Sequence, residues 1–262
     1  MPHVLAVSNQ KGGVGKTTTA VNLAASLAHL GHPTLLVDLD PQGNASSGVG
    51  CAMDLAEVGS YDMLLGDKRL HEVTYGTSIE GLDIVPATEA LVGAEIEMYG
   101  LPRAQLRLRE AFGDLSSFYD FVVTDGPPSL GMLTVNVLAA ADSVLVPVQG
   151  EYFALEGLGA LMRTMAKVRK ALNPRLVREG IVITMHDPRS RLCRAVCGEL
   201  RDMFGDEVFD EVIPRNVRLS EAPSHGEPIL GYEPRSVGAN AYLALASELI
   251  RKNHSHLLEA SA

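Results

Sequence analysis

Short apolar runs recur along the chain, separated by longer segments of mixed character. Runs without polar alternation are typical of strands that are covered on both faces, as in a parallel sheet. The runs that we predict to be strands are Val4–Val7, Thr34–Val37, Gly81–Pro86, Phe121–Asp125, Ser143–Val148, Ile181–Met185 and Val208–Ile213.

The segments between these runs predict helices. The predicted helices are an alanine- and leucine-rich run ending near Leu30, a turn at Tyr61–Leu65, an amphipathic helix at Leu101–Leu115, Leu155–Leu172, a segment ending near Phe204, and Val237–Arg251. Pro214–Gly226 is predicted to be a loop. The alternation favours one α/β domain over residues 1–251, a doubly wound and mostly parallel sheet flanked by helices, followed by a frayed tail at 252–262.

A glycine-rich segment, Lys11–Thr18, follows the first predicted strand and precedes the first helix. Backbone N–H groups of such a loop surround phosphate oxygens, while a lysine adds charge and a hydroxyl ligates Mg²⁺. The usual pattern G-x-x-x-x-G-K-[ST] would place its first glycine at Gln10, and this chain carries an additional lysine, Lys11, instead. An ordinary glycine-rich turn is the alternative, but three glycines followed by Lys16 and Thr17 favour nucleotide binding. The nucleotide-contacting residues expected from this segment are Lys11, Gly12, Gly13, Val14, Gly15, Lys16, Thr17 and Thr18.

Two aspartates follow predicted strands. Asp40 lies just after the second strand, and Asp125 ends the strand that begins at Phe121. Ligands of open α/β sheets bind at the carboxyl edge, so Asp40 is placed to face the phosphates, although an Asp-Pro turn closed by an Asx hydrogen bond would use the same residues. An apolar strand ending in aspartate is a Walker-B arrangement, in which Asp125 holds the Mg²⁺ shell. An apolar strand ending in aspartate is common and is weak evidence alone, but beside the glycine-rich loop it indicates a nucleotide and Mg²⁺ site.

The charge balance narrows the possible partners. The chain has 22 Lys and Arg against 32 Asp and Glu, a net charge of −10, which argues against a general nucleic-acid binder. The stretch from Arg163 to Arg194 is nevertheless basic, with only Glu179 and Asp187 opposing it. We therefore expect one basic face on an otherwise acidic protein.

The three cysteines are Cys51, Cys193 and Cys197. They form no C-x-x-C pair, and their odd number fits a reducing cytoplasm. Cys193 and Cys197 are spaced to share one face of a helix, where they could be metal ligands or small buried residues. No signal-peptide pattern opens the chain and no apolar run reaches the ~20 residues of a membrane span, so we expect a soluble cytoplasmic protein.

Three segments, Lys11–Thr18, Asp38–Asn44 and Asp125–Gly131, make the sequence resemble the chromosome-partitioning ATPases of ParA (Soj) type, within the deviant-Walker-A ATPases that include MinD. A fourth, Pro214–Ser224, is typical of the ParA branch. The resemblance extends from about Val4 to Arg251. Gly126 departs from it, because relatives usually carry cysteine or threonine there, but this leaves the role of the preceding aspartate intact.

The resemblance implies a P-loop NTPase that hydrolyses ATP with Mg²⁺, in which two subunits enclose two ATP molecules face to face. Lys11 would reach the partner's nucleotide, and Lys16 would act within its own subunit. Asp40 would position or activate water, while Thr17 and Asp125 would hold the metal. Pro214 and Asn216 would contact adenine, since an amide can both donate to and accept from its edge.

The resemblance also implies sequence-nonspecific binding of double-stranded DNA by the ATP-bound homodimer, through Arg189 and Arg218. A ParB-type partner would stimulate hydrolysis, and the protein would associate with the nucleoid. One alternative is a MinD-like membrane-associated regulator, which needs a basic amphipathic C-terminal helix; Leu249–Glu259 is short and poorly amphipathic. Another is an amidoligase or an iron–sulfur reductase of the same fold, but the cysteines are not at suitable places for a shared cluster.

Overall fold

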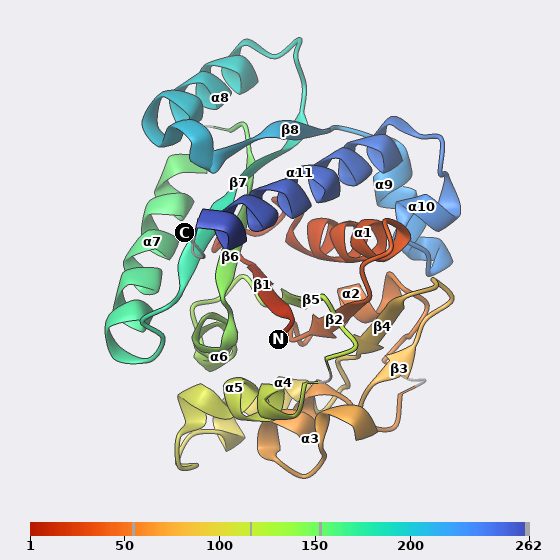
Figure 1. Ribbon diagram of the computed structural model, residues 1–262, viewed down its shortest axis with the longest axis vertical. Coiled ribbons are helices and arrows are strands. Elements are labelled where there is room, and N and C mark those ends of the chain that lie inside the picture. Colours follow the sequence, from red (N-terminus) through yellow and green to blue (C-terminus); the bar gives the residue numbers. More distant parts are fainter. Residues whose placement is uncertain (54–55, 116, 152–153, 260–262) are drawn as a thin grey trace.

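A single twisted sheet runs through the computed structural model, which describes residues 1–53, 56–115, 117–151 and 154–259 (Figure 1). Within these residues the strand order is β3-β4-β2-β5-β1-β6-β7-β8, and each neighbouring pair is parallel except antiparallel β3–β4. The strands are β1 (His3–Val7), β2 (Thr34–Asp38), β3 (Tyr75–Gly76), β4 (Leu82–Val85), β5 (Phe121–Asp125), β6 (Ser143–Gln149), β7 (Val177–His186) and β8 (Val208–Pro214). The predicted strands and the mostly parallel sheet are confirmed.

Both faces of the sheet are buried, which explains the unbroken apolar runs. Successive side chains of a strand point to opposite faces, so Val4 and Ala6 pack into one core and Leu5 and Val7 into the other. Helices α1 (Lys16–His29) and α11 (Val237–Glu259) lie together over one face. The opposite face is covered by α3 (Ser60–Leu65), α4 (Leu91–Glu97), α5 (Arg107–Ala111), α6 (Met132–Ala140), α7 (Ala154–Ala171) and α8 (Arg191–Phe204).

Short helices occupy the connections. They are α2 (Asn44–Ser47), α9 (Val217–Glu221), α10 (Ile229–Tyr232) and the 3₁₀ turns Leu70–Glu72, Ala104–Leu106, Phe112–Asp114, Gly205–Glu207 and Ala222–His225. The prediction of a loop over Pro214–Gly226 was wrong, because α9 and a 3₁₀ turn lie within it. The side-chain Oδ1 of Asn216 accepts a hydrogen bond from the backbone N–H of Arg218 at 2.8 Å and so caps α9.

The predicted continuous helix at Leu101–Leu115 was also wrong, and Asn136 of α6 supplies the physical reason. In an unbroken helix the N–H of Leu108 would donate to the carbonyl of Ala104. Instead, Leu108 N donates to Asn136 Oδ1 at 3.1 Å, and Asn136 Nδ2 donates to Ala104 O at 2.8 Å. The amide of Asn136 therefore stands between the two groups, and the segment divides into a 3₁₀ turn, α5 and a second 3₁₀ turn.

The closing helix is longer than expected. It was predicted to end at Arg251 but continues to Glu259, and residues 260–262 of the predicted tail lie outside the described residues. Among the helices that the structure describes, none has the length and apolar character needed to cross a lipid bilayer.

Replacing Asn136 tests how much this inserted amide stabilises the fold. Asn136 is fully buried, so Asn136→Leu leaves the Leu108 N–H and the Ala104 carbonyl without partners. At about 1–3 kcal/mol for each unpaired group, we expect the free energy of unfolding to fall by about 2–6 kcal/mol in urea denaturation. Asn240→Leu, at an exposed position of α11, is the control and should change it little. Equal stability of both variants would contradict this role.

Candidate nucleotide-binding site

The glycine-rich loop, Asp40 and Asp125 meet at one edge of the sheet because the strands that precede or contain them end in register. β5 lies between β1 and β2, and Asp125 is level with Val7 on one side and with Asp38 on the other. The glycine-rich loop leaves β1 at this edge, and the chain that carries Asp40 leaves β2 there. The topology thus brings together the loop, Asp40 and Asp125, as the sequence led us to expect.

Two residues outside the glycine-rich loop, Asn9 and Thr184, hold it in place. Asn9 donates from Nδ2 to the carbonyl of Pro147 at 2.7 Å and accepts the N–H of Lys11 at 3.0 Å. Thr184 of β7 donates from its hydroxyl to the carbonyl of Val14 at 2.8 Å. Gly15 has φ 80°, a conformation that favours glycine, and forms the N-cap of α1. The N-terminal end of a 14-residue helix therefore faces the loop.

Lys16 is buried at the first turn of α1 and only 7% exposed. Its Nζ donates to the carbonyl of Lys11 at 3.1 Å, inside the curve of the loop. Burial lowers the pKa of this ammonium group, while the negative charges of Asp125 and Asp40 oppose that shift. A polyphosphate bound in the loop would supply the anionic partner that a buried ammonium group requires.

Asp125 is fully buried, and neither carboxylate oxygen has a hydrogen bond of normal geometry within the described residues. Burial and the charge of Asp38 raise its pKa well above the usual range, whereas the nearby Thr17 hydroxyl and Lys16 lower it. A buried carboxylate without donors, next to a hydroxyl at the start of a helix, is a donor set suited to a hard divalent cation. These residues therefore fit Mg²⁺.

The two aspartates after β2 have different surroundings. Asp38 accepts hydrogen bonds from the N–H of Ser46 at 2.8 Å, the Ser46 hydroxyl at 2.7 Å and the N–H of Asp40 at 3.1 Å, while burial raises its pKa to about 6. Asp40 accepts the N–H of Gln42 at 3.0 Å, which is the Asx bond of the alternative interpretation. Asp40 also lines the cavity over the loop, so the turn and a role at the phosphates are compatible.

Two adjoining cavities open over the loop. One, of about 370 Å³, is lined by Gly12, Gly13, Lys16, Asp40 and Pro128 among others. The second, of about 540 Å³, is lined by residues that include Pro214, Asn216 and Tyr242. The residues that line both are Gly15, Thr17, Thr18, Asn44 and Met185. A phosphate compartment therefore continues into a larger one at the end of β8, where Pro214 and Asn216 were expected. Because Asn216 Oδ1 already caps α9, its NH₂ group is the part of the amide left to donate.

Lys11 does not join this buried group. Its Nζ donates to Glu151 Oε2 of the same chain at 2.7 Å, and its side chain is partly exposed. Lys11 thus lies at the rim of the site, engaged with a carboxylate from the connection that follows β6.

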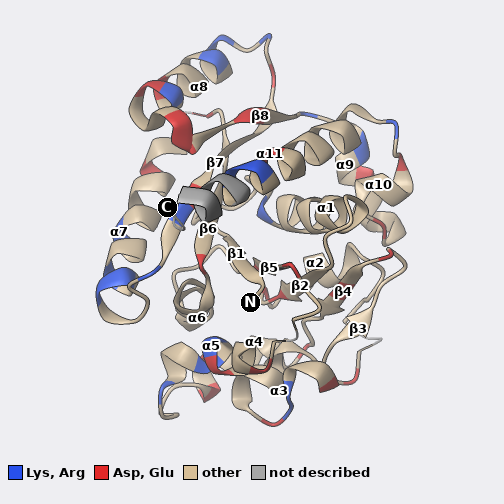
Figure 2. Cartoon of the chain, in the orientation of Figure 1, with Lys and Arg blue, Asp and Glu red and all other residues tan. Residues whose placement is uncertain are grey.

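The two predicted DNA-binding arginines are exposed on neighbouring connections. Arg189 follows β7 and is paired with Asp187, and Arg218 is on α9 after β8 and is paired with Glu221. His186 is level with Pro214 in the sheet, so both connections leave from one edge. Figure 2 shows basic residues on the chain leading into α8 and near α9.

The basic stretch from Arg163 to Arg194 does not form the single face that we expected. The last turn of α7 carries Arg169 and Lys170 and precedes the start of β7, whereas Arg189 follows the opposite end of that strand. The ten residues of β7 separate the two groups by roughly 33 Å. Arg178, in the same stretch, forms an ion pair with Glu207 and lies over the Phe204 ring, contacts within its own chain.

Sequence reasoning assigned no role to several residues that shape the site. Asn9 adjoins the glycine-rich loop, so its position was a usable signal. Ser46 had a weaker sequence signal. Its hydroxyl donates to Asp38 and accepts the N–H of Ala87 at 2.9 Å. No sequence signal pointed to Thr184, because it lies 170 residues from its hydrogen-bond partner Val14. Met185, next to it, lines both cavities with a positive φ of 49°.

Comparisons with known proteins agree with this geometry. A family model described as an AAA domain matches residues 2–178. The chain is 53% identical to the chromosome-partitioning ATPase Soj of Thermus thermophilus, covering 95% of each chain, and 51% identical to the sporulation initiation inhibitor protein Soj of Bacillus subtilis, covering 95% of this chain and 98% of that one. The crystal structure of a Mycobacterium smegmatis protein named cobyrinic acid a,c-diamide synthase, with bound ADP and magnesium, superposes with a TM-score of 0.86 at 36% identity, covering 98% and 97% of the two chains. The chain belongs to the ParA/Soj family of chromosome-partitioning ATPases.

Proposed function

We propose that this protein is an ATP-dependent DNA-partitioning switch, in which an ATP-bound dimer binds DNA and a ParB-type partner triggers hydrolysis and release. The observation that carries the proposal is the position of Lys11. The buried site already contains one lysine for the bound phosphates, and the second lies at the rim in an ion pair with Glu151.

The nucleotide step uses the buried part of the site. The loop N–H groups and Lys16 bind the phosphates, and the larger cavity accepts the base against Pro214 and Asn216. Thr17 and Asp125 are the residues that would hold Mg²⁺, which neutralises charge on the phosphates when bound. The related mycobacterial structure, with ADP and magnesium, supports this assignment.

The dimerisation step requires Lys11 to exchange partners. Its ion pair with Glu151 is partly exposed on both sides, and such pairs contribute at most about 1 kcal/mol. The phosphates of a facing subunit carry more negative charge than one carboxylate. Lys11 therefore moves from Glu151 to the partner's nucleotide at little cost, and ATP becomes the link between two subunits.

Hydrolysis and DNA binding follow from the same dimer. Asp40 lines the phosphate compartment and orients the attacking water through the carboxylate oxygen that does not accept the Gln42 N–H. The exposed pairs of Arg189 and Arg218 with nearby carboxylates are weak enough for DNA phosphates to replace them. Two copies of this edge, presented side by side in the dimer, double the number of phosphate contacts.

Substituting the two lysines separates binding from dimerisation. We expect Lys16→Ala to lose ATP binding, since a buried charge for the phosphates is removed. Lys11→Ala should bind ATP as the wild type does but remain a monomer with ATP. Fluorescent-nucleotide titration and light scattering with a slowly hydrolysed ATP analogue measure the two properties. A dimeric Lys11→Ala protein would contradict a role across the interface.

Replacing Asp40 tests the hydrolytic step. Asp40→Ala should bind ATP and dimerise while phosphate release falls by about 10²–10⁴-fold, the usual contribution of a group that manages a proton or water in the transition state. Gln42→Ala, in the same turn, is the control. Wild-type turnover without any acid or amine substrate would also separate this function from amide ligation, which the printed name of the mycobacterial relative suggests. Normal turnover by Asp40→Ala would refute the assignment.

Arg218→Ala should weaken DNA retention in the ATP state. Each lost phosphate contact lowers the slope of log K against log salt by roughly one, so a symmetric dimer should lose about two. Arg169→Ala, beyond the far end of β7, removes an equal charge and should leave the slope unchanged. Retention is measured with ATP, ADP and no nucleotide. Equal retention in the three states would overturn the switch.

A further inference from the structure

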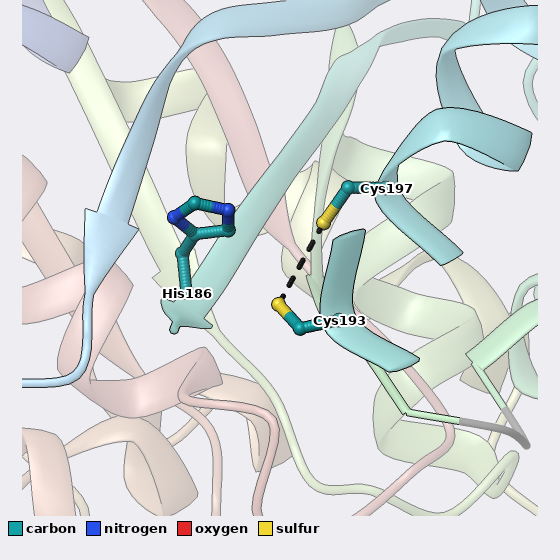
Figure 3. Close-up of side chains that lie close together, drawn as sticks. All are labelled: His186, Cys193 and Cys197. Atoms are coloured by element: carbon teal, nitrogen blue, oxygen red, sulfur yellow. Dashed lines mark hydrogen bonds between the residues drawn. The ribbon is translucent and has the colours of Figure 1, made fainter. Parts of the chain in front are cut away.

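A histidine and two cysteines meet at the carboxyl end of β7, outside the nucleotide site (Figure 3). His186 is the last residue of β7, and Cys193 and Cys197 lie one turn apart on α8. The two sulfur atoms are 3.9 Å apart, and the three possible ligand atoms all lie within 4.8 Å of one another. Both sulfurs point toward the space beside the imidazole ring.

We propose that His186, Cys193 and Cys197 bind a thiophilic divalent cation, with Zn²⁺ as its type. Two thiolates and one imidazole form a ligand set that zinc accepts, with a fourth position left for water or another ligand. Zn–S bonds of about 2.3 Å in a tetrahedral site place two sulfurs about 3.8 Å apart. The observed separation of 3.9 Å already matches that spacing, so only the imidazole has to approach.

The proposed metal site is buried on the side of the two cysteines and open to solvent on the side of His186. Cys193 and Cys197 are 4% and 3% exposed, whereas His186 is partly exposed and gives access from solvent. Gly150 lies against Cys193 so closely that a Cβ there would stand 2.7 Å from the sulfur. The backbone after β6 therefore closes the buried side, and a larger residue at 150 would displace the thiol.

The local charge is compatible with a metal only when both thiols are ionised. Arg191, Arg194 and Arg201 are on the same helix, and such an arginine-rich setting disfavours an added cation. Two thiolates and one neutral imidazole around Zn²⁺ make a complex with no net charge. Burial and the neighbouring Cys193 raise the pKa of the Cys197 thiol to about 11, with Arg201 opposing that shift, so metal binding has to displace thiol protons. Soft sulfur ligands thus explain why this position would take zinc and not Mg²⁺.

A metal at this point would fasten the connection that carries Arg189. The connection runs from His186 to the start of α8 at Arg191, so a bridge from His186 to Cys193 and Cys197 ties its two ends. Shortening the free segment restricts the conformations of Arg189 before DNA arrives. This consequence, unlike the metal site itself, rests on the proposed function.

The metal site is tested on the full chain, without nucleotide or DNA, after treatment with a chelator and a phosphine reductant. We expect about one Zn²⁺ per chain in competition with a chromophoric chelator. Co²⁺ should give thiolate-to-metal absorption in the near ultraviolet and the intense visible bands of a tetrahedral site. Cys193→Ala/Cys197→Ala should abolish both signals, and His186→Asn should weaken Zn²⁺ binding at least by the roughly 10–100-fold that loss of a supporting partner costs.

Matched variants keep the test decisive. Cys51→Ala removes the remaining cysteine and His71→Asn an exposed histidine, and both should bind Zn²⁺ as the wild type does. Zn²⁺ should also raise the Tm of the wild type and of these controls but not of Cys197→Ala, whose fold is checked by circular dichroism. Equal binding by wild type and the double alanine variant, or a Co²⁺ spectrum without thiolate bands, would overturn the site. DNA retention with and without Zn²⁺ then tests the effect on Arg189 separately.

Discussion

The burial of charged side chains at one edge of the sheet is the constraint on which this structure depends. Three adjacent strands end in register, and this brings Asp38, Asp125 and Lys16 into the same buried space. Burial disfavours the charged form of each, raising the pKa of both aspartates and lowering that of the lysine. The pocket is therefore electrostatically incomplete by itself, and a polyphosphate with its cation supplies the missing charges. Ligand binding and stabilisation of the pocket are then one event.

Asp38 accepts three hydrogen bonds from its own chain. Its contacts with Ser46 and with the N–H of Asp40 fix the turn after β2 and hold Asp40 over the phosphate compartment. Asp125 lies in the neighbouring strand with no such donors. The contrast separates a carboxylate that orders the backbone from one that remains available to a metal. Sequence patterns place both at strand ends and cannot make this distinction.

The strands and the glycine-rich loop could be predicted because their signals are local. An apolar run buried on both faces, and a loop between strand and helix, are each contained in a few neighbouring residues. The features that escaped prediction depend on distant partners. The amide of Asn136 interrupts a helix that lies 28–32 residues earlier, and the Thr184 hydroxyl holds a loop 170 residues away. The division of the basic stretch between the two ends of β7 likewise needs the length of the strand in space.

The end of β7 connects the parts of the molecule that a nucleotide switch has to connect. Thr184 contacts the glycine-rich loop, and Met185 lines both cavities with a positive φ. His186, the next residue, is level with Pro214, which lines the larger cavity, and Arg189 follows three residues later. A bulky residue held at positive φ is strained, and strain of this kind persists where the surroundings impose it. The glycine-rich loop, the larger cavity and the proposed DNA contact therefore share one short piece of backbone. A short stretch, residues 185–189, thus joins the cavities that Met185 lines to the exposed Arg189.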